Sequence, residues 1–300
     1  MPNEEKLKAS TARWDELPAE ITTDILQRLG TIDIVESAQR VCSSWWKVCH
    51  DPAMWHVIHL KYEPATDRMS RVLEKICRIA VDRSQGQLLE LSIHNFGSRD
   101  LLNYIAERAI QLRHLRLVKC FRNFAGGLAA AAKNFPLLEE LHIYCTFITK
   151  EDIESIGRSC SLLKSFILNS SAYNELGFRL PLEDEGQALA IARSMPELRH
   201  LALVDNALTN VGLEAILDGC PHLESLDLRR CYNIDLEGDL GRRCRQQIVD
   251  LKQPCASTDD YEFSSHANAS HYFSSSRMMA TETIVHLMMK MKAGNFIVMP

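Results

Sequence analysis

Ten cysteines and eleven histidines are the side chains of this sequence that could bind a metal ion or act as nucleophile and base. No two cysteines are separated by just two residues, so the Cys-x-x-Cys pairs of zinc ribbons and thioredoxin-like redox sites are missing. His56 and His59 stand three apart, but no glutamate lies between them and no third ligand is near. We therefore expect no metal site and no cofactor.

Catalysis by these groups is not expected either. His142 and Cys145 could suggest a base and a thiol nucleophile, but residues three apart on a strand point to opposite faces of the sheet. The patterns Gly-x-Ser-x-Gly, Gly-x-x-x-x-Gly-Lys and Gly-x-Gly-x-x-Gly do not occur in the sequence. The sequence therefore predicts no catalytic residue and a protein that is not an enzyme.

The composition is that of a globular protein, with 46% hydrophobic and 24% charged residues among 300. No apolar run reaches the ~18 residues that a membrane-spanning helix needs, and the charged first ten residues lack the apolar core of a secretory signal. A net charge of −5 without a long basic run argues against nucleic-acid binding. We expect a protein of the nucleus and/or cytoplasm, without membrane or nucleic-acid partners, whose cysteines are reduced and mostly buried.

A repeat runs from Leu88 to about Cys231 and must position any binding residue of that part of the chain. Its unit reads Leu-x-x-Leu-x-Leu, and the middle residues recur at steps of about 25 residues, except for one step of 35 from Phe166 to Leu201. The extra residues lie near 172–183, where Gly177 and Pro181 predict a protruding loop. The six units are Leu88/Leu91/Ile93, Leu112/Leu115/Leu117, Leu138/Leu141/Ile143, Leu163/Phe166/Leu168, Leu198/Leu201/Leu203 and Leu223/Leu226/Leu228.

The remainder of each unit indicates what the repeat builds. Helical segments follow the leucines, for example from Lys150 and from Asn210, and Pro136, Pro196 and Pro221 end the helices because proline cannot continue them. One strand and one helix cannot bury their own apolar face, so neighbouring units must stack. The sequence predicts an α/β fold, a leucine-rich-repeat solenoid with a parallel sheet on the concave face and helices outside. Five residues after the middle leucine, mostly small or polar side chains suit contact with the backbone where the chain leaves the strand: Phe96, Cys120, Thr146, Ser171, Asn206 and Cys231.

A different segment, from Trp14 to Leu60, precedes the repeat. It holds all four tryptophans of the chain and two apolar stripes, from Ile21 to Leu29 and from Ile34 to Cys49. Fewer than about 50 residues rarely build an independent core, so this much apolar surface implies a partner. The alternative is that these helices only cap the open end of the solenoid.

This segment closely resembles an F-box, in order and in spacing. The matching residues are Leu17-Pro18-x-Glu20-Ile21-x-x-x-Ile25-Leu26-x-x-Leu29, Val41-Cys42-x-x-Trp45 and Asp51-Pro52-x-x-Trp55. Together with the repeats, residues 14–261 resemble F-box/leucine-rich-repeat proteins of the plant branch. From the residues and this resemblance together we expect a flexible N-terminus at 1–13, a three-helix F-box at 14–60, a helical linker or cap at 61–87 and about six repeats at 88–250. The composition alone, which matches nothing in the family over the last forty residues, predicts a largely disordered Ser- and Met-rich tail at 251–300.

The resemblance implies a substrate-recognition subunit of an SCF-type E3 ubiquitin ligase. In that family the F-box docks on a Skp-type adaptor and through it on a cullin-RING module, while the repeats hold an unknown protein for ubiquitylation. Docking of helices in a groove, with aromatic anchors, would carry the adaptor contact. Some matched residues must instead hold the three helices together, and Trp45 and Ile25 are expected to do both. The implied adaptor-binding residues are Leu17, Pro18, Ile21, Ile25, Leu26, Leu29, Val41, Cys42, Trp45 and Trp55.

Substrate contacts are expected on the concave face of the sheet. Side chains alternate along a strand, so the residues between and beside the leucines face away from the core. They form either a polar binding patch or simply a solvated sheet face, and no uniform charge pattern points to a ligand class. The residues are Arg116, His142, Tyr144, Asn169, Asp227 and Arg229.

Three other functions stay open at this point. The chain could be a repeat scaffold, or an F-box protein that acts outside a ligase. It could also be a sensor whose repeats bind a small molecule together with a substrate. We rank the sensor last, because six repeats form only a shallow arc.

Overall fold

The computed structural model describes residues 17–61, 67–120, 126–170 and 185–259. The strands of this part are β1 Val57–Leu60, β2 Glu90–His94, β3 His114–Val118, β4 Glu140–Tyr144, β5 Ser165–Asn169, β6 His200–Val204, β7 Ser225–Asp227 and β8 Asp250–Lys252. The helices between them are α4 Asp67–Arg83, α5 Arg99–Arg108, α6 Gly127–Ala132, α7 Lys150–Ser159, α9 Gly186–Ser194, α10 Asn210–Gly219 and α11 Gly238–Gln247. The N-terminal elements are α1 Ala19–Leu26, α2 Thr31–Glu36, the 3-10 turn η2 Ala38–Arg40, α3 Ser43–Cys49 and the 3-10 turn η3 Pro52–Trp55.

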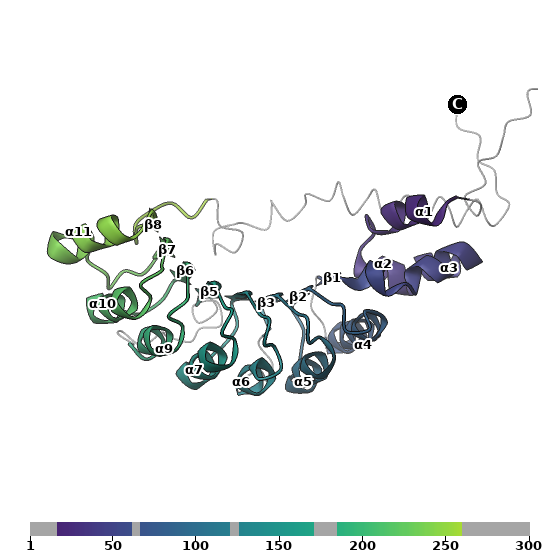
Figure 1. The fold of residues 1–300 in the computed structure, drawn as a ribbon, viewed down its shortest axis with the longest axis horizontal. Coiled ribbons are helices and arrows are strands. Elements are labelled where there is room, and N and C mark those ends of the chain that lie inside the picture. The colour runs from purple at the N-terminus through teal and green to yellow at the C-terminus, as the bar shows by residue number, and fades with distance from the viewer. Residues whose placement is uncertain (1–16, 62–66, 121–125, 171–184, 260–300) are drawn as a thin grey trace, which may run out of the picture.

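The strands form one parallel sheet in the order β1-β2-β3-β4-β5-β6-β7-β8, and each strand pairs with the next one along the chain. The sheet lines the inner side of an arc, the helices from α4 onward lie on the outer side, and α1, α2 and α3 lie at the β1 end (Figure 1). A strand followed by an outer helix can close only by stacking on its neighbour, which produces this arc. The predicted α/β solenoid, with its sheet on the concave face, is confirmed.

The predicted leucines make the core. Register pairs Leu91 with Leu115 and Leu115 with Leu141, and it continues through Phe166 to Leu201. Each of these side chains is at most 2% exposed. They belong to one hydrophobic cluster that contains residues from Leu26 in α1 to Ile248 before β8. The N-terminal helices and the solenoid therefore share a core.

The sheet is longer than the six predicted repeats. Strand β1 lies within the segment predicted as F-box, and β8 extends past the predicted end of the repeats at residue 250. The first unit was missed because Trp55 stands where the others have leucine and because Ile58 lies 33 residues before Leu91. The segment 61–87, predicted as a linker or cap, contains α4, which is the outer helix of this first unit.

The second N-terminal stripe is divided among three elements. Ile34 lies in α2, Ala38 in η2, and Trp45 in α3. The chain becomes extended at Cys42, with φ −158° and ψ 173°, before α3 begins. All three side chains are still at most 5% exposed, so the stripe faces one core although its helix is broken.

Five units share one backbone conformation near the end of the strand. The residue four positions after the middle leucine of the unit is left-handed, with φ between 49° and 66°, and these residues are Asn95, Lys119, Cys145, Asp205 and Arg230.

The next residue binds backbone, as its type predicts. The Cys120 thiol donates to the Val118 carbonyl at 3.4 Å, and the Thr146 hydroxyl donates to the Tyr144 carbonyl at 3.1 Å. Thr146 Oγ1 also accepts from the Cys120 amide at 3.0 Å, which joins two neighbouring repeats. The predicted backbone contact at this position is therefore confirmed for these two residues.

A buried carboxylate joins two outer helices. Asp152 in α7 is 1% exposed. Its oxygens accept from the Thr149 hydroxyl at 2.9 Å, the Thr149 amide at 3.2 Å and the Ala129 amide of α6 at 3.2 Å. The side chain thus caps its own helix and supplies an acceptor to the preceding one.

Several predicted features fall outside the described residues. They are the N-terminus at 1–13, the loop near 172–183, and the tail from 260 onward. Residues 251–259, predicted as the start of the tail, belong to the folded part: the Arg230 amide donates to the Pro254 carbonyl at 2.8 Å. Within the described ranges, no helix is long and apolar enough to cross a membrane, and no group of three or more His, Cys, Asp or Glu side chains is placed to hold a metal ion.

Candidate functional site

The first candidate surface lies on α1 to α3, where the ten implied adaptor-binding residues divide by exposure. Pro18 is exposed, and Ile21 is 47% exposed. Four residues are partly exposed: Leu17, Ile25, Val41 and Cys42. Four are buried: Leu26, Leu29, Trp45 and Trp55. The apolar surface that a partner could reach therefore comes from the first six.

The buried four hold the helices together. Trp45 and Trp55 are each 1% exposed, and Trp55 Nε1 donates to the Cys49 carbonyl at 3.1 Å. Leu26 and Leu29 are 0% and 7% exposed. Side chains covered to this degree have little area left for an adaptor, so the expectation that Trp45 serves both purposes is corrected to a role in the core.

Trp46 is an exposed aromatic residue that the sequence reasoning did not select. Its side chain on α3 is 52% exposed, and its ring stacks on His50 with centroids 4.1 Å apart. Trp45 lies on the predicted apolar stripe and Trp46 does not, because two successive residues point to different faces of a helix. Exposed tryptophan is the residue type most enriched among binding hot spots, which was the available signal.

Arg83 at the end of α4 joins the N-terminal helices to the solenoid. Its Nη2 donates to Gln39 Oε1 at 2.6 Å and lies 3.2 Å from His50 Nε2. Burial lowers the pKa of the guanidinium, against a smaller opposing effect of Cys49. The first outer helix therefore holds the segment between η2 and α3 directly.

The second candidate surface is the concave face of β3, β4 and β5. The Arg116 guanidinium lies 4.9 Å from the centroid of the Tyr144 ring, and the His142 ring meets Tyr144 edge-on at 6.3 Å. Val118, Tyr144 and Ile167 pack together as a small apolar cluster outside the main core. We call these five residues the Tyr144 cluster; three of the six predicted substrate residues belong to it.

His142 is held as a neutral base in this cluster. Its Nε2 lies 3.3 Å from Ser165 Oγ and 3.6 Å from Glu140 Oε2. Burial lowers its pKa, and the nearby charges of Arg116 and His114 lower it further, while Glu140 opposes them. A neutral imidazole can accept or donate one hydrogen bond without adding charge to the face.

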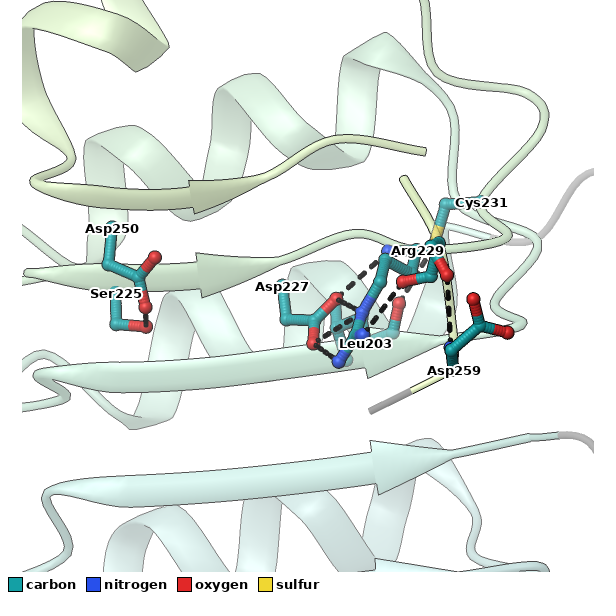
Figure 2. A network of polar contacts seen from close by, with 8 residues as sticks. Leu203, Ser225, Asp227, Arg229, Cys231, Asp250 and Asp259 are labelled. Carbon is teal, nitrogen blue, oxygen red and sulfur yellow. Dashed lines mark hydrogen bonds and ion pairs between the residues drawn. The ribbon is translucent and has the colours of Figure 1, made fainter. Parts of the chain in front are cut away.

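Asp227 and Arg229 are bound to each other (Figure 2). Arg229 Nη2 donates to Asp227 Oδ2 at 2.7 Å and Nε donates to Oδ1 at 3.0 Å, while Nη1 donates to the Ser257 carbonyl at 3.0 Å. Arg229 is 2% exposed. The pair fastens the chain after β8 to the sheet, so its predicted role as open substrate contacts is corrected.

Asn169 is the sixth predicted substrate residue, and it is also covered. Its side chain is 1% exposed, and the Cys145 thiol donates to its Oδ1 at 3.7 Å. Asn169 therefore supports the strand end of the neighbouring repeat.

The buried thiols of the repeats have low reactivity. Eight of the ten cysteines are buried, Cys42 is partly exposed, and Cys255 is exposed. Burial raises the pKa of Cys77, Cys120 and Cys160 to about 12. A thiol with such a pKa carries almost no thiolate near neutral pH, so it is a poor nucleophile and metal ligand.

Comparison with known proteins agrees with this architecture. A family model described as F-box-like matches residues 14–61, and a Leucine Rich repeat model matches 195–217 and 219–238. From Arabidopsis thaliana, F-box protein SKIP19 is 44% identical over 263 residues, 87% of this chain and 84% of its own length. Putative F-box/LRR-repeat protein 21 is 44% identical over 264 residues, which are 83% of this chain and 84% of that protein. The chain belongs to the F-box/LRR-repeat family.

Another relative within this family is longer than the chain. Putative F-box/LRR-repeat protein 23 of Arabidopsis thaliana is 48% identical over 250 residues, which are 82% of this chain and 54% of that protein. The chain thus spans about half the length of that relative. The predicted likeness to plant F-box/LRR-repeat proteins is confirmed.

The two family matches can be placed on the fold of this F-box/LRR-repeat protein. The F-box-like match ends at residue 61, directly after β1, so it includes the first strand of the sheet. The repeat match covers only the region from the end of α9 to the start of α11. The remaining strands are recognised through their register with those of the matched units.

Proposed function

We propose that this F-box/LRR-repeat protein is the substrate-recognition subunit of an SCF-type E3 ubiquitin ligase. Its N-terminal helices would dock on a Skp-type adaptor, and through it on a cullin-RING module. Its concave sheet face would hold the protein to be ubiquitylated. The protein itself would contribute no catalytic residue and would act in the nucleus and/or cytoplasm.

The observation that carries this proposal is the exposed apolar surface of α1 and α3. Ile21 is 47% and Trp46 is 52% exposed at the end of the arc. Helices that only capped the solenoid would bury such side chains, as Leu26 and Trp45 are buried. Large apolar side chains left facing outward are typical of a surface that a partner covers.

Membership in the F-box/LRR-repeat family favours the role of a ligase receptor over that of a repeat scaffold. A repeat scaffold needs no F-box, whereas here the F-box-like region is joined to the sheet through one core. An F-box protein acting outside a ligase would still bind the adaptor, so cullin recruitment separates it from the proposed receptor.

Co-expression with a Skp-type adaptor tests the proposal. We expect the wild-type chain to form a stable complex with the adaptor, and Ile21→Asp to abolish it while the chain stays folded by circular dichroism. Val211→Asp is the matched control, because Val211 is a 63% exposed apolar residue on α10. If the two variants bind the adaptor equally, or if the wild type does not bind it, the N-terminal helices are a cap and the proposal is wrong.

A further inference from the structure

Trp46, the exposed indole of the proposed adaptor surface, is supported by a second ring. It stacks on the His50 imidazole with centroids 4.1 Å apart and an angle of 26° between the ring planes. Trp46 is 52% exposed and lies on α3, whereas His50 directly follows the last residue of that helix. One face of the indole is therefore covered by His50, and the orientation of the indole depends on what holds the imidazole.

The imidazole of His50 is held at both of its nitrogens. Nδ1 lies 2.8 Å from the Trp46 carbonyl oxygen, and Nε2 lies 3.2 Å from Arg83 Nη2. The His50 amide donates to the Lys47 carbonyl at 3.1 Å, so the ring of His50 caps the Trp46 carbonyl at the end of α3. Contacts through two different ring atoms fix the plane of the imidazole, and the indole lies against that plane.

These two contacts determine which ring nitrogen carries the proton. A guanidinium has donors and no acceptor, so Arg83 must donate to His50 and Nε2 must offer its lone pair. The Trp46 carbonyl can only accept, so Nδ1 carries the hydrogen and donates to it. Only the neutral ring with its proton on Nδ1 satisfies both neighbours. Arg83 thus selects one of the two neutral tautomers of His50.

Arg83 is in turn fixed by the N-terminal segment. The same Nη2 that faces His50 donates to Gln39 Oε1 at 2.6 Å, and Gln39 Nε2 donates to the Val35 carbonyl of α2. One hydrogen of Nη2 is thereby directed at Gln39, which leaves the other for His50. Because Arg83 is the last residue of α4, the first outer helix of the solenoid reaches the ring on which Trp46 rests.

We propose that Arg83 is a positioning residue of the adaptor surface: acting through His50, it holds the Trp46 indole in the orientation that the adaptor meets. This inference rests on the proposed function and adds to it a residue of the first solenoid unit. An indole that is ordered before binding loses less side-chain entropy when a partner covers it, so the affinity is higher.

The affinity of the full chain for a Skp-type adaptor tests the proposal in four proteins: the wild type, Arg83→Met, Trp46→Ala and the double variant. We expect Trp46→Ala to lower the affinity by about tenfold or more, as the loss of an aromatic anchor does. Arg83→Met should lower it by about threefold to tenfold when Trp46 is present. In the double variant Arg83→Met should cause no further loss, because its effect passes through the indole.

Two further variants separate this role from a general loss of stability. Arg158→Met is the matched control, because Arg158 is an exposed arginine of the outer helix α7 that pairs with Glu154, and it should leave the adaptor affinity unchanged. His50→Phe keeps a ring for stacking but offers no acceptor to Arg83, so it should lose about as much affinity as Arg83→Met. All variants are compared at a temperature at which circular dichroism shows that they are folded.

The protonation of the His50 ring is a readout that a merely structural role of Arg83 would not move. In nitrogen-15 spectra of the wild-type chain at neutral pH, we expect Nδ1 of His50 to carry the hydrogen and Nε2 to carry none. In Arg83→Met the tautomer with its hydrogen on Nε2 should become populated, because Nε2 has lost its donor. Arg158→Met should give the wild-type spectrum.

Four results would overturn the inference. They are an equal loss of affinity from Arg83→Met with and without Trp46, wild-type affinity in Arg83→Met or His50→Phe, an equal loss in Arg158→Met, and a wild-type His50 ring with its hydrogen on Nε2. A wild-type chain that binds the adaptor no better than Trp46→Ala does contradicts this inference only. A wild-type chain that does not bind the adaptor at all contradicts the proposed function itself.

Discussion

The guanidinium of Arg83 lies 5.4 Å from the centroid of the Trp55 ring, where the last turn of α4 meets the end of the N-terminal helices. Trp55 is 1% exposed and belongs to the core shared with the sheet. A cation over a buried indole, with Gln39 and His50 as further partners, is stabilised by contacts from both regions. This contact connects the N-terminal helices to the first outer helix of the solenoid.

Arg83→Met should therefore destabilise the chain. The substitution keeps much of the side-chain length but removes the charge and leaves Gln39 without its donor, which should lower the free energy of unfolding by about 1–3 kcal/mol. Denaturant titration measures it. The control Arg158→Met removes an exposed ion pair with Glu154 and should cost about 0.5 kcal/mol or less. Equal losses of unfolding free energy in the two variants would show that the Arg83 contacts stabilise the fold no more than an exposed ion pair does.

Asp152→Ala should destabilise the fold more than most substitutions of polar residues. It removes the acceptor of the Thr149 and Ala129 amides in a buried place, so the free energy of unfolding should fall by about 2 kcal/mol or more. Asp152→Asn keeps one oxygen as an acceptor, so its free energy of unfolding should lie between that of Asp152→Ala and that of the wild type. Glu151→Ala, in the same helical turn but exposed, is the control for urea unfolding. An Ala variant as stable as the wild type contradicts the capping role.

Gly219→Ala should destabilise α10 although alanine favours helices. A Cβ at this position would stand 2.2 Å from the Ala192 carbonyl oxygen of α9, a backbone atom that cannot rotate away. We expect the free energy of unfolding to fall by about 1–3 kcal/mol, more than the roughly 1 kcal/mol that helix propensity would return. Thermal unfolding of Gly219→Ala is compared with that of the control Glu214→Ala, since Glu214 is exposed on the same helix. A stabilised Gly219→Ala would mean that the two helices can separate at no cost.

His94 should make the fold sensitive to mild acid. Its pKa falls from the ordinary value of 6.5 to about 3 in the fold, mainly because of burial, so the unfolded chain binds the proton more readily. Stability is full above pH 6.5 and is lost as the pH falls toward 3, by up to about 1.4 kcal/mol per pH unit for this one group.

The matched comparison is His94→Gln with His222→Gln, since His222 is exposed. Unfolding free energies measured from pH 7 to pH 5 should fall less steeply for His94→Gln than for the wild type. His222→Gln should follow the wild type. Parallel curves for all three proteins would contradict the burial of a neutral His94.

One thiol should react much faster than the others. Cys255 is exposed, whereas burial raises the pKa of Cys220 and Cys231 to about 12. Mass spectrometry after brief iodoacetamide treatment of the native chain should find label mainly at Cys255, with slower labelling at the partly exposed Cys42. The variant Cys255→Ser should lose the fast phase. Rapid labelling of Cys120 or Cys231 would indicate that the repeat core opens.

The repeat could be predicted from sequence because its signal is carried by spacing. Leu91, Leu115 and Leu141 recur at one period, and stacking requires that they share a core. The first strand gave no such signal, since Trp55 replaces the leucine and a long helix lies between Ile58 and the next unit. Tertiary packing, rather than local sequence, decides that β1 joins the sheet.

The candidate surfaces were predicted less completely than the fold. Alternation places Asp227 and Arg229 on the concave face, but it cannot show that they bind each other instead of a partner. In the same way, motif matching selects Trp45 without showing that its side chain is buried and that Trp46 beside it is exposed.

A single residue, His56, separates the last turn of the N-terminal helices from strand β1. No hinge of small or extended residues lies at this junction, so the distance from the N-terminal helices to a point on the concave face is counted in strands, at about 4.8 Å each. Inserting one complete unit into the arc would move the last repeats farther from the N-terminal helices while leaving both candidate surfaces unchanged. Repeat number thus sets the distance between the two ends of the molecule.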